Sequence, residues 1–394
     1  MRPVMVLDEL SRSIANDPGA SLSVTPAYRA RFVALGRQLA ARIAKEAGQP
    51  ARWTFLLFER WRDNALAAEF EKRYPQHAAQ RRSVPDDFYK GREDDAPCIV
   101  ALPPEIWQHV ECATLADAFT QEWWAAWLEQ VWRQAHKRLE RQDFAAVLIS
   151  RAGALTLARN FAYLGNQRPP GATQKRLFRY QDPRVMQRVW PALSAMQRTL
   201  WLDPVLAWWA PMHPWGPWEP QLFGQDALPD DLEPQWFQAE KPAPESIGDD
   251  TEIYRGALFN ARQWALAHSA PVGNQIWRNC ALDGLGAAEQ PDAKSMDRLI
   301  AEGQALGLSE ENLQNYVRYG WLGRWTDPAA GELCSAWQSP QGAQALRRAL
   351  DTLAQQPQAR LATLLHEAGA LPRRQTNPAP IPARENPQGP AHGR

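Results

Sequence analysis

The stretch "FRYQDPRVMQRVW", residues 178–190, places two arginines on either side of an aspartate where a helix is predicted to begin. Asp182 precedes a proline, which disfavours helical geometry before it, and Pro183 suits the first helical position. Asp182 is therefore predicted to be the helix N-cap. Arg179 and Arg184 are expected to form a charge-assisted clamp with its carboxylate, which specifies the corner and requires no substrate. The residues assigned to this structural clamp are Arg179, Tyr180, Asp182, Pro183 and Arg184.

No other set of residues has the spacing of a catalytic or metal-binding motif. His109 and Cys112 could share a helical face, but two ligands do not make a zinc site. Ser150 lacks the flanking glycines of a nucleophile elbow and is interpreted as a strand end or helix cap. The stretch "GLGAAEQ", residues 284–290, has no lysine for a phosphate loop and is interpreted as a helix end. We therefore predict no catalytic residue, no metal and no cofactor.

Short apolar runs alternate with helical patterns in the first half of the chain. This alternation favours an α/β or mixed sheet with helical cover. Pro191 is predicted to kink or split the helix that begins at Pro183. Trp123, Trp127 and Val131 lie on one stripe of a long helix, which is typical of core packing. The predicted strands are 53–58, 97–105, 144–150 and 175–181, and the predicted helices include 26–47, 60–74, 114–141 and 153–164.

From Pro204 the composition changes, because the stretch "PVLAWWAPMHPWGPWEPQ" is rich in proline and tryptophan. Prolines lack an amide donor and restrict the preceding residue, so no long regular element is expected there. Rigid tryptophans lose little entropy on binding, which makes this stretch a candidate partner-binding surface. The alternative is that the same rings pack the lobes together. The candidate residues are Trp208, Trp209, Trp215 and Trp218.

The predicted domain organisation has an α/β lobe followed by an all-α lobe. The helical lobe is predicted from the near-continuous helical pattern of residues 251–366. The tail is rich in proline and poor in apolar residues, which favours disorder. The predicted parts are a helical extension (1–50), an α/β lobe (51–210), an interlobe connection (211–250), a helical lobe (251–366) and a disordered tail (367–394).

The composition excludes several classes of function. Lysine plus arginine equal aspartate plus glutamate at 44 each among 394 residues, so no global basic field favours nucleic acid as a partner. No run approaches the roughly 20 apolar residues that cross a bilayer, so no membrane insertion is expected. The four cysteines are far apart and no apolar signal segment follows the first methionine. These features predict a cytoplasmic protein with reduced thiols.

An ordered set of segments is similar to the type VI secretion effector adaptors, also called Tap or TEC chaperones. The similarity covers roughly residues 50–340. Gln181 departs from the family pattern, in which another aromatic is common, and Leu202-Asp203-Pro204 stands where a glycine-proline turn is usual. The segments are "WTFLLFERWRDNALAAEF", "PCIVALPPE", "AAVLISRAGALTLARNFAYL", "LFRYQDPRVMQRVWPALSAMQRTLWLDPVLAWWAP" and "LIAEGQALGLSEENLQNYVRYGWLGRW".

The resemblance implies a two-lobed, non-enzymatic adaptor. Such a protein binds a toxic effector in the bacterial producer cell and delivers it to the VgrG spike of the secretion tube. Two other hypotheses stay open at this point. One is a hydrolase-like enzyme with an unrecognised active site, and the other is a structural or immunity component of the secretion locus.

Overall fold

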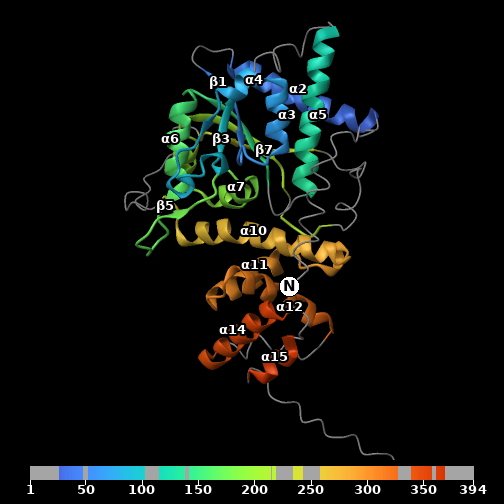
Figure 1. Cartoon of the computed structure of the whole chain (residues 1–394), viewed down its shortest axis with the longest axis vertical. Helices are drawn as coiled ribbons and strands as arrows, with labels where there is room; N and C mark the ends of the chain where they lie inside the picture. The colour runs from blue at the N-terminus through green and yellow to red at the C-terminus, as the bar shows by residue number, and fades with distance from the viewer. Residues whose placement is uncertain are drawn as a thin grey trace, which may run out of the picture. The chain divides into compact units, whose positions relative to one another are not determined.

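A computed structural model shows the fold (Figure 1). The chain divides into two compact units, residues 1–305 and residues 306–394. The boundary falls inside the region 251–366, which the sequence analysis treated as one helical lobe. Most of the predicted tail and the first 25 residues lie outside the described residues. The structure describes residues 26–47, 52–102, 115–137, 142–213, 215–218, 234–242, 258–326, 339–356 and 361–368.

The first unit is built on a six-stranded sheet with the order β2-β3-β1-β4-β7-β8. Every neighbouring pair is antiparallel. The prediction of mixed α and β structure is confirmed. The antiparallel direction of the strands could not be predicted, because a continuous apolar run indicates only that a strand is buried on both faces. The strands are β1 (Trp53–Phe58), β2 (Arg82–Ser83), β3 (Cys98–Ala101), β4 (Phe144–Ser150), β7 (Val205–Pro211) and β8 (Trp236–Glu240).

One strand prediction and one prediction of irregular structure are wrong. Of residues 175–181, only β6 (Arg176–Leu177) is a strand, and it pairs with β5 (Asn166–Gln167) in a separate two-stranded sheet. The stretch that was expected to lack long regular elements contains β7, an inner strand of the main sheet. Pro204 and Pro211 stand only at its ends, so the six residues between them are free to pair.

Helices cover both faces of the sheet. On one face, α2, α3 and α5 pack around Leu56 and Phe58 of β1. On the other face, α6, α7, α8 and α10 pack around Phe55 and Leu57, because alternate side chains of a strand point to opposite faces. The helices of this unit are α2 (Pro26–Ala47), α3 (Ala65–Arg73), α4 (Pro75–Ala79), α5 (Leu115–Lys137), α6 (Ala154–Gly165), α7 (Pro183–Val189), α8 (Ala195–Leu202), α10 (Ala261–Leu282) and α11 (Ala293–Ala305).

The predicted stripe on α5 is core, as expected. Trp127 and Val131 are buried, and the ring of Trp123 is stacked on that of Trp127. The predicted break at Pro191 is also confirmed. Helix α7 ends at Val189, a short 3-10 turn follows, and α8 begins at Ala195 with a capping box formed by the residue before it.

The described part of the second unit consists of α12 (Glu310–Thr326), α14 (Pro340–Gln355) and α15 (Leu361–Glu367). The Asn312 side chain donates to Asp351 Oδ1 at 2.6 Å, which ties α12 to α14. Ser309 Oγ accepts from Asn312 N at 3.3 Å, as expected of a helix cap. No helix in the described ranges is long and apolar enough to cross a membrane.

Candidate functional site

Asp182 is the N-cap residue directly before α7, and its side chain is completely buried. Its Oδ1 accepts hydrogen bonds from Arg184 N at 3.0 Å and from Arg184 Nε at 2.8 Å, and its Oδ2 accepts from Arg184 Nη2 at 2.6 Å. Pro183 stands at the start of the helix, as predicted, because it needs no amide partner there. The pair is therefore a bidentate, charge-assisted contact that also caps the helix.

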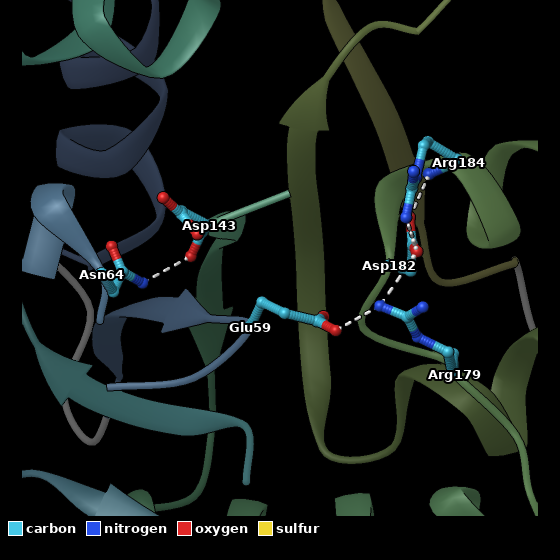
Figure 2. Close-up of polar contacts among 6 residues, drawn as sticks. All are labelled: Glu59, Asn64, Asp143, Arg179, Asp182 and Arg184. Carbon is cyan, nitrogen blue, oxygen red and sulfur yellow. Dashed lines mark hydrogen bonds and ion pairs between the residues drawn. The ribbon is translucent and has the colours of Figure 1, made fainter. Parts of the chain in front are cut away.

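Arg179 extends this contact to a second carboxylate. Its Nη2 lies 3.4 Å from Asp182 Oδ2 and also donates to Glu59 Oε1. Figure 2 shows the Arg179 guanidinium between the two acids, with Arg184 on the far side of Asp182. We call the four residues Glu59, Arg179, Asp182 and Arg184 the polar corner. Two cations face two anions, so their formal charges cancel.

The charge states of the corner follow from these contacts. Burial opposes ionisation of Asp182, but the Arg184 and Arg179 guanidinium groups and the hydrogen bonds from Arg184 outweigh it and hold its pKa well below the ordinary value. Burial raises the pKa of Glu59, and Arg179 opposes that rise. The charge of Glu59 raises the pKa of Arg179 further above its already high value. Asp182 therefore stays a carboxylate.

Glu59 is positioned by the end of β1, where the chain leaves the sheet. Its backbone amide donates to Asp143 O at 3.1 Å, and Asn64 Nδ2 donates to the same carbonyl at 2.9 Å (Figure 2). Asn64 Oδ1 caps α3 by accepting from Ala67 N at 3.0 Å. The strand end and the cap together fix the backbone from which Glu59 reaches Arg179, 120 residues later in sequence.

Sequence reasoning missed Glu59. The available signal is a carboxylate directly after the apolar run "WTFLLF", at the point where a buried strand reaches the edge of the sheet. This signal locates Glu59 at the end of a strand. It does not predict that Arg179 is its partner, because the two residues meet only in the folded chain.

Two neighbours of the corner carry buried polar atoms. Gln181 is fully buried, and neither of its side-chain amide atoms has a hydrogen-bond partner among the described residues. The Tyr180 hydroxyl also has none within that part of the chain, and its ring lies 5.1 Å from that of Phe161. Burial raises the pKa of Tyr180 well above its ordinary value, so the phenol is neutral near pH 7. Tyr180 therefore acts as a core ring.

Three of the four candidate partner-binding tryptophans are core residues. Trp208 and Trp209 of β7 are 0% and 2% exposed and lie in the cores on opposite faces of the sheet. Trp218 is also buried, and its backbone amide donates to Gln290 Oε1 at 3.0 Å. The expectation that these three rings form an exposed aromatic surface is therefore corrected. Helices cover both faces of the sheet at β7, so neighbouring residues of this strand are buried on opposite sides.

Trp215 is half-buried and lies against α10. The Arg188 guanidinium sits 4.0 Å from its ring centroid, and the Trp277 ring lies 4.8 Å away. A Cβ on Gly273 would come within 2.4 Å of the Trp215 ring. The ring thus packs closely on the backbone of α10, as the alternative of structural packing predicts.

The remaining candidates from the sequence give no site within the described ranges. Ser150 is buried at the end of β4, where its Oγ accepts from Ala152 N at 3.0 Å. No group of three or more His, Cys, Asp or Glu side chains in those ranges could hold a metal ion. His109 and Cys112 lie outside the described residues.

No family model, curated protein or solved structure matches the chain. The similarity to type VI effector adaptors therefore stays a prediction from the sequence segments.

Proposed function

We propose that this chain is a non-enzymatic adaptor of a bacterial type VI secretion system. It binds a toxic effector in the cytoplasm of the producer cell and loads it onto the VgrG spike, without cofactor or turnover. The proposal includes a two-lobed organisation, in which a sheet-containing lobe is followed by a helical one.

The Asp182 carboxylate, which is paired on both oxygens, is the main support. The most diagnostic segment of the resemblance carries Arg179, Asp182 and Arg184, and the Asp182 carboxylate accepts hydrogen bonds on both oxygens while fully buried. A carboxylate with a strongly lowered pKa and no exposed atom is a poor base and a poor nucleophile. The residues of this segment therefore suit a scaffold better than a reaction centre.

The order of the similar segments gives further support. Four of them fall on β1 with most of α3, on β3, on β4 with α6, and on α7 through β7, in the order in which these elements build the sheet and its cover. The fifth falls on the end of α11 and on α12.

Co-purification tests the proposal. A tagged full-length chain is isolated from a producer cell that expresses its secretion locus, and bound proteins are identified by mass spectrometry. We expect a VgrG-type protein and a toxin in stoichiometric amounts, and export of that toxin should stop when the adaptor gene is deleted. Recovery of the chain without either protein, together with unchanged export, would contradict the proposal.

The competing enzyme hypothesis makes a different prediction for Glu59. It is the carboxylate of the corner whose pKa is raised, and its Oε2 has no hydrogen-bond partner among the described residues. An enzyme whose reaction centre is the polar corner would depend on it as a general base. An adaptor with Glu59→Gln should still export its toxin, and the circular dichroism spectrum of the purified variant shows whether it is folded.

A further inference from the structure

Residues 144–181 have a charge composition unlike that of the whole chain. They contain six arginines and lysines and no aspartate or glutamate, whereas the complete chain has a formal charge of zero. Arg179 belongs to the polar corner. The other five side chains are exposed, and none forms an ion pair with a described residue. These five are Arg151, Arg159, Arg168, Lys175 and Arg176.

Helix α6 presents a mixed apolar and basic stripe to solvent. Its inner side is buried against the sheet through Leu157, Phe161 and Leu164. On the opposite side, Leu155, Arg159 and Tyr163 follow at four-residue spacing, which places them on one face. Leu155 is 57% exposed and Tyr163 is 63% exposed. The two apolar side chains therefore flank a cation and pack against no core.

The β5–β6 hairpin continues this surface from the end of α6 (Figure 1). Asn166 Nδ2 donates to Ala162 O at 2.7 Å, Gln167 Nε2 donates to Tyr163 O, and Phe178 N donates to Gly165 O at 2.8 Å. These bonds hold both strands of the hairpin to the last turn of the helix. The hairpin carries three of the exposed cations, and we define the α6 face as Leu155, Arg159, Tyr163, Arg168, Lys175 and Arg176.

Asp86 is a carboxylate near the α6 face, but it forms no ion pair with a described cation of that face. Burial raises the pKa of Asp86, and Lys175 opposes that rise only weakly. Asp86 Oδ1 accepts from Phe88 N at 2.9 Å, and its side chain is buried. Among the residues that the structure describes, no carboxylate therefore forms an ion pair with the cations of the hairpin.

We propose that the α6 face is the docking surface for an acidic segment of a partner protein that carries apolar side chains between its carboxylates. The carboxylates complement the unpaired cations, and the apolar side chains cover Leu155 and Tyr163. Nucleic acid fits less well, because its phosphates offer no apolar partner to a leucine. This inference rests on the proposed adaptor function and deepens it, since it names the surface and the chemistry of the partner.

The test compares two full-length variants with equal charge change. Arg159→Glu, Arg168→Glu and Lys175→Glu together reverse the α6 face. Three exposed cations of α2 and α3, on helices covering the other face of the sheet, provide the matched control. The control combines Arg37→Glu, Lys45→Glu and Lys72→Glu. Both variants should retain the circular dichroism spectrum and melting temperature of the wild type, as is usual for surface substitutions.

The binding probe is a fluorescein-labelled synthetic peptide of 18 residues, with glutamate and leucine at helical spacing, measured in ~0.15 M salt. The wild type and the control should bind this peptide with equal affinity. Reversal of the α6 face should weaken binding by about tenfold or more, because rim charges become repulsive. Replacing Leu155 and Tyr163 by alanine should weaken it as well, and replacing every glutamate of the peptide by glutamine should abolish it.

Three outcomes would overturn the proposal. The first is equal affinity of the wild type and the α6 variant. The second is binding of single-stranded DNA or phosphatidylserine vesicles at least as tight as that of the peptide. The third is tighter binding of a peptide of residues 219–233, the acidic segment of this chain, which would make the occupant internal.

Failure of the docking surface and failure of the adaptor function give different results. If VgrG co-purifies equally with the wild type and the α6 variant, the surface is wrong and the adaptor function stands. If the peptide binds as expected while no VgrG-type protein or toxin is recovered, the surface stands and the adaptor function is wrong.

Discussion

Arg184 and Arg159 represent two regions in which the same residue type has opposite surroundings. In the polar corner, Arg184 is 2% exposed, and both hydrogen bonds from its guanidinium go to the Asp182 carboxylate. On the α6 face, Arg159 is exposed and meets no carboxylate of the described chain. The partner within the fold, more than the residue type, therefore separates a structural cation from one that is exposed for binding.

The largest effect should come from breaking the buried pair. Asp182→Ala removes the cap of α7 and the carboxylate that the buried Arg184 guanidinium contacts at 2.6 Å. We expect the free energy of unfolding to fall by about 3 to 5 kcal/mol, measured by urea denaturation with tryptophan fluorescence.

Asp203→Ala is the matched control for this variant. Asp203 pairs with Lys241 at 3.1 Å, but its side chain is 61% exposed, so its loss should cost at most about 1 kcal/mol. Equal unfolding curves for the two variants would show that the corner is not structural.

A smaller loss of stability should come from adding a side chain at the end of α6. Gly165 ends α6, and a Cβ there would lie 2.3 Å from Asp86 Oδ2. Gly165→Ala should lower the free energy of unfolding by about 1 to 3 kcal/mol, because the buried carboxylate has to move. Gly153 precedes the same helix, and a Cβ there meets nothing within 4 Å. Gly153→Ala should therefore leave the melting temperature nearly unchanged, and similar losses in both variants would contradict this account.

Within the polar corner, Glu59 should make the free energy of unfolding depend on pH. Burial raises the pKa of Glu59 above its ordinary value of 4.5, against the attraction of Arg179. The stability from this group is complete below pH 4.5 and is lost as the pH rises through the folded-state pKa. Glu59→Gln should therefore reduce the loss of stability with rising pH above 4.5, measured by denaturation at several pH values.

Glu93 is the control, because its pKa is shifted in the opposite direction from that of Glu59. A hydrogen bond from the Gly91 amide lowers the pKa of this exposed side chain, so its contribution is present above pH 4.5 and is lost as the pH falls. Glu93→Gln should change the profile only below pH 4.5. If Glu59→Gln leaves the profile above pH 4.5 unchanged, the Glu59 carboxyl is not perturbed by burial.

The smallest effect on stability should come from the α6 face. Arg159 forms no ion pair with a described residue, so Arg159→Glu breaks none. The free energy of unfolding of this variant should stay within about 0.5 kcal/mol of the wild type. Affinity for the acidic peptide should nevertheless fall. A large loss of stability in this variant would show that Arg159 has a structural role and would remove the contrast with Arg184.

The local features of the fold could be predicted from the sequence. Periodicity located α2, a short apolar run located β4, and the Asp-Pro step located the cap of α7, because these signals depend on neighbours in the chain. The same reasoning predicted that Pro191 would interrupt the helix. Each of these features is decided within one or two turns of backbone.

Features that depend on distant contacts could not be predicted. Glu59 joins Arg179 only because the end of β1 lies beside the start of α7, and no spacing in the sequence encodes that proximity. Trp208 and Trp209 resembled a rigid surface segment because prolines follow them, yet they form the centre of two cores. The hydrophobicity of a segment does not indicate whether its cover comes from the same chain or from a partner.

The most direct test of the central claim is affinity purification of three tagged proteins from the producer cell: the wild type, the reversed α6 face and the control on α2 and α3. The account predicts that a VgrG-type protein and a toxin are recovered with the wild type and the control, and that at least one of them is lost from the α6 variant. Recovery of neither protein with the wild type would contradict it.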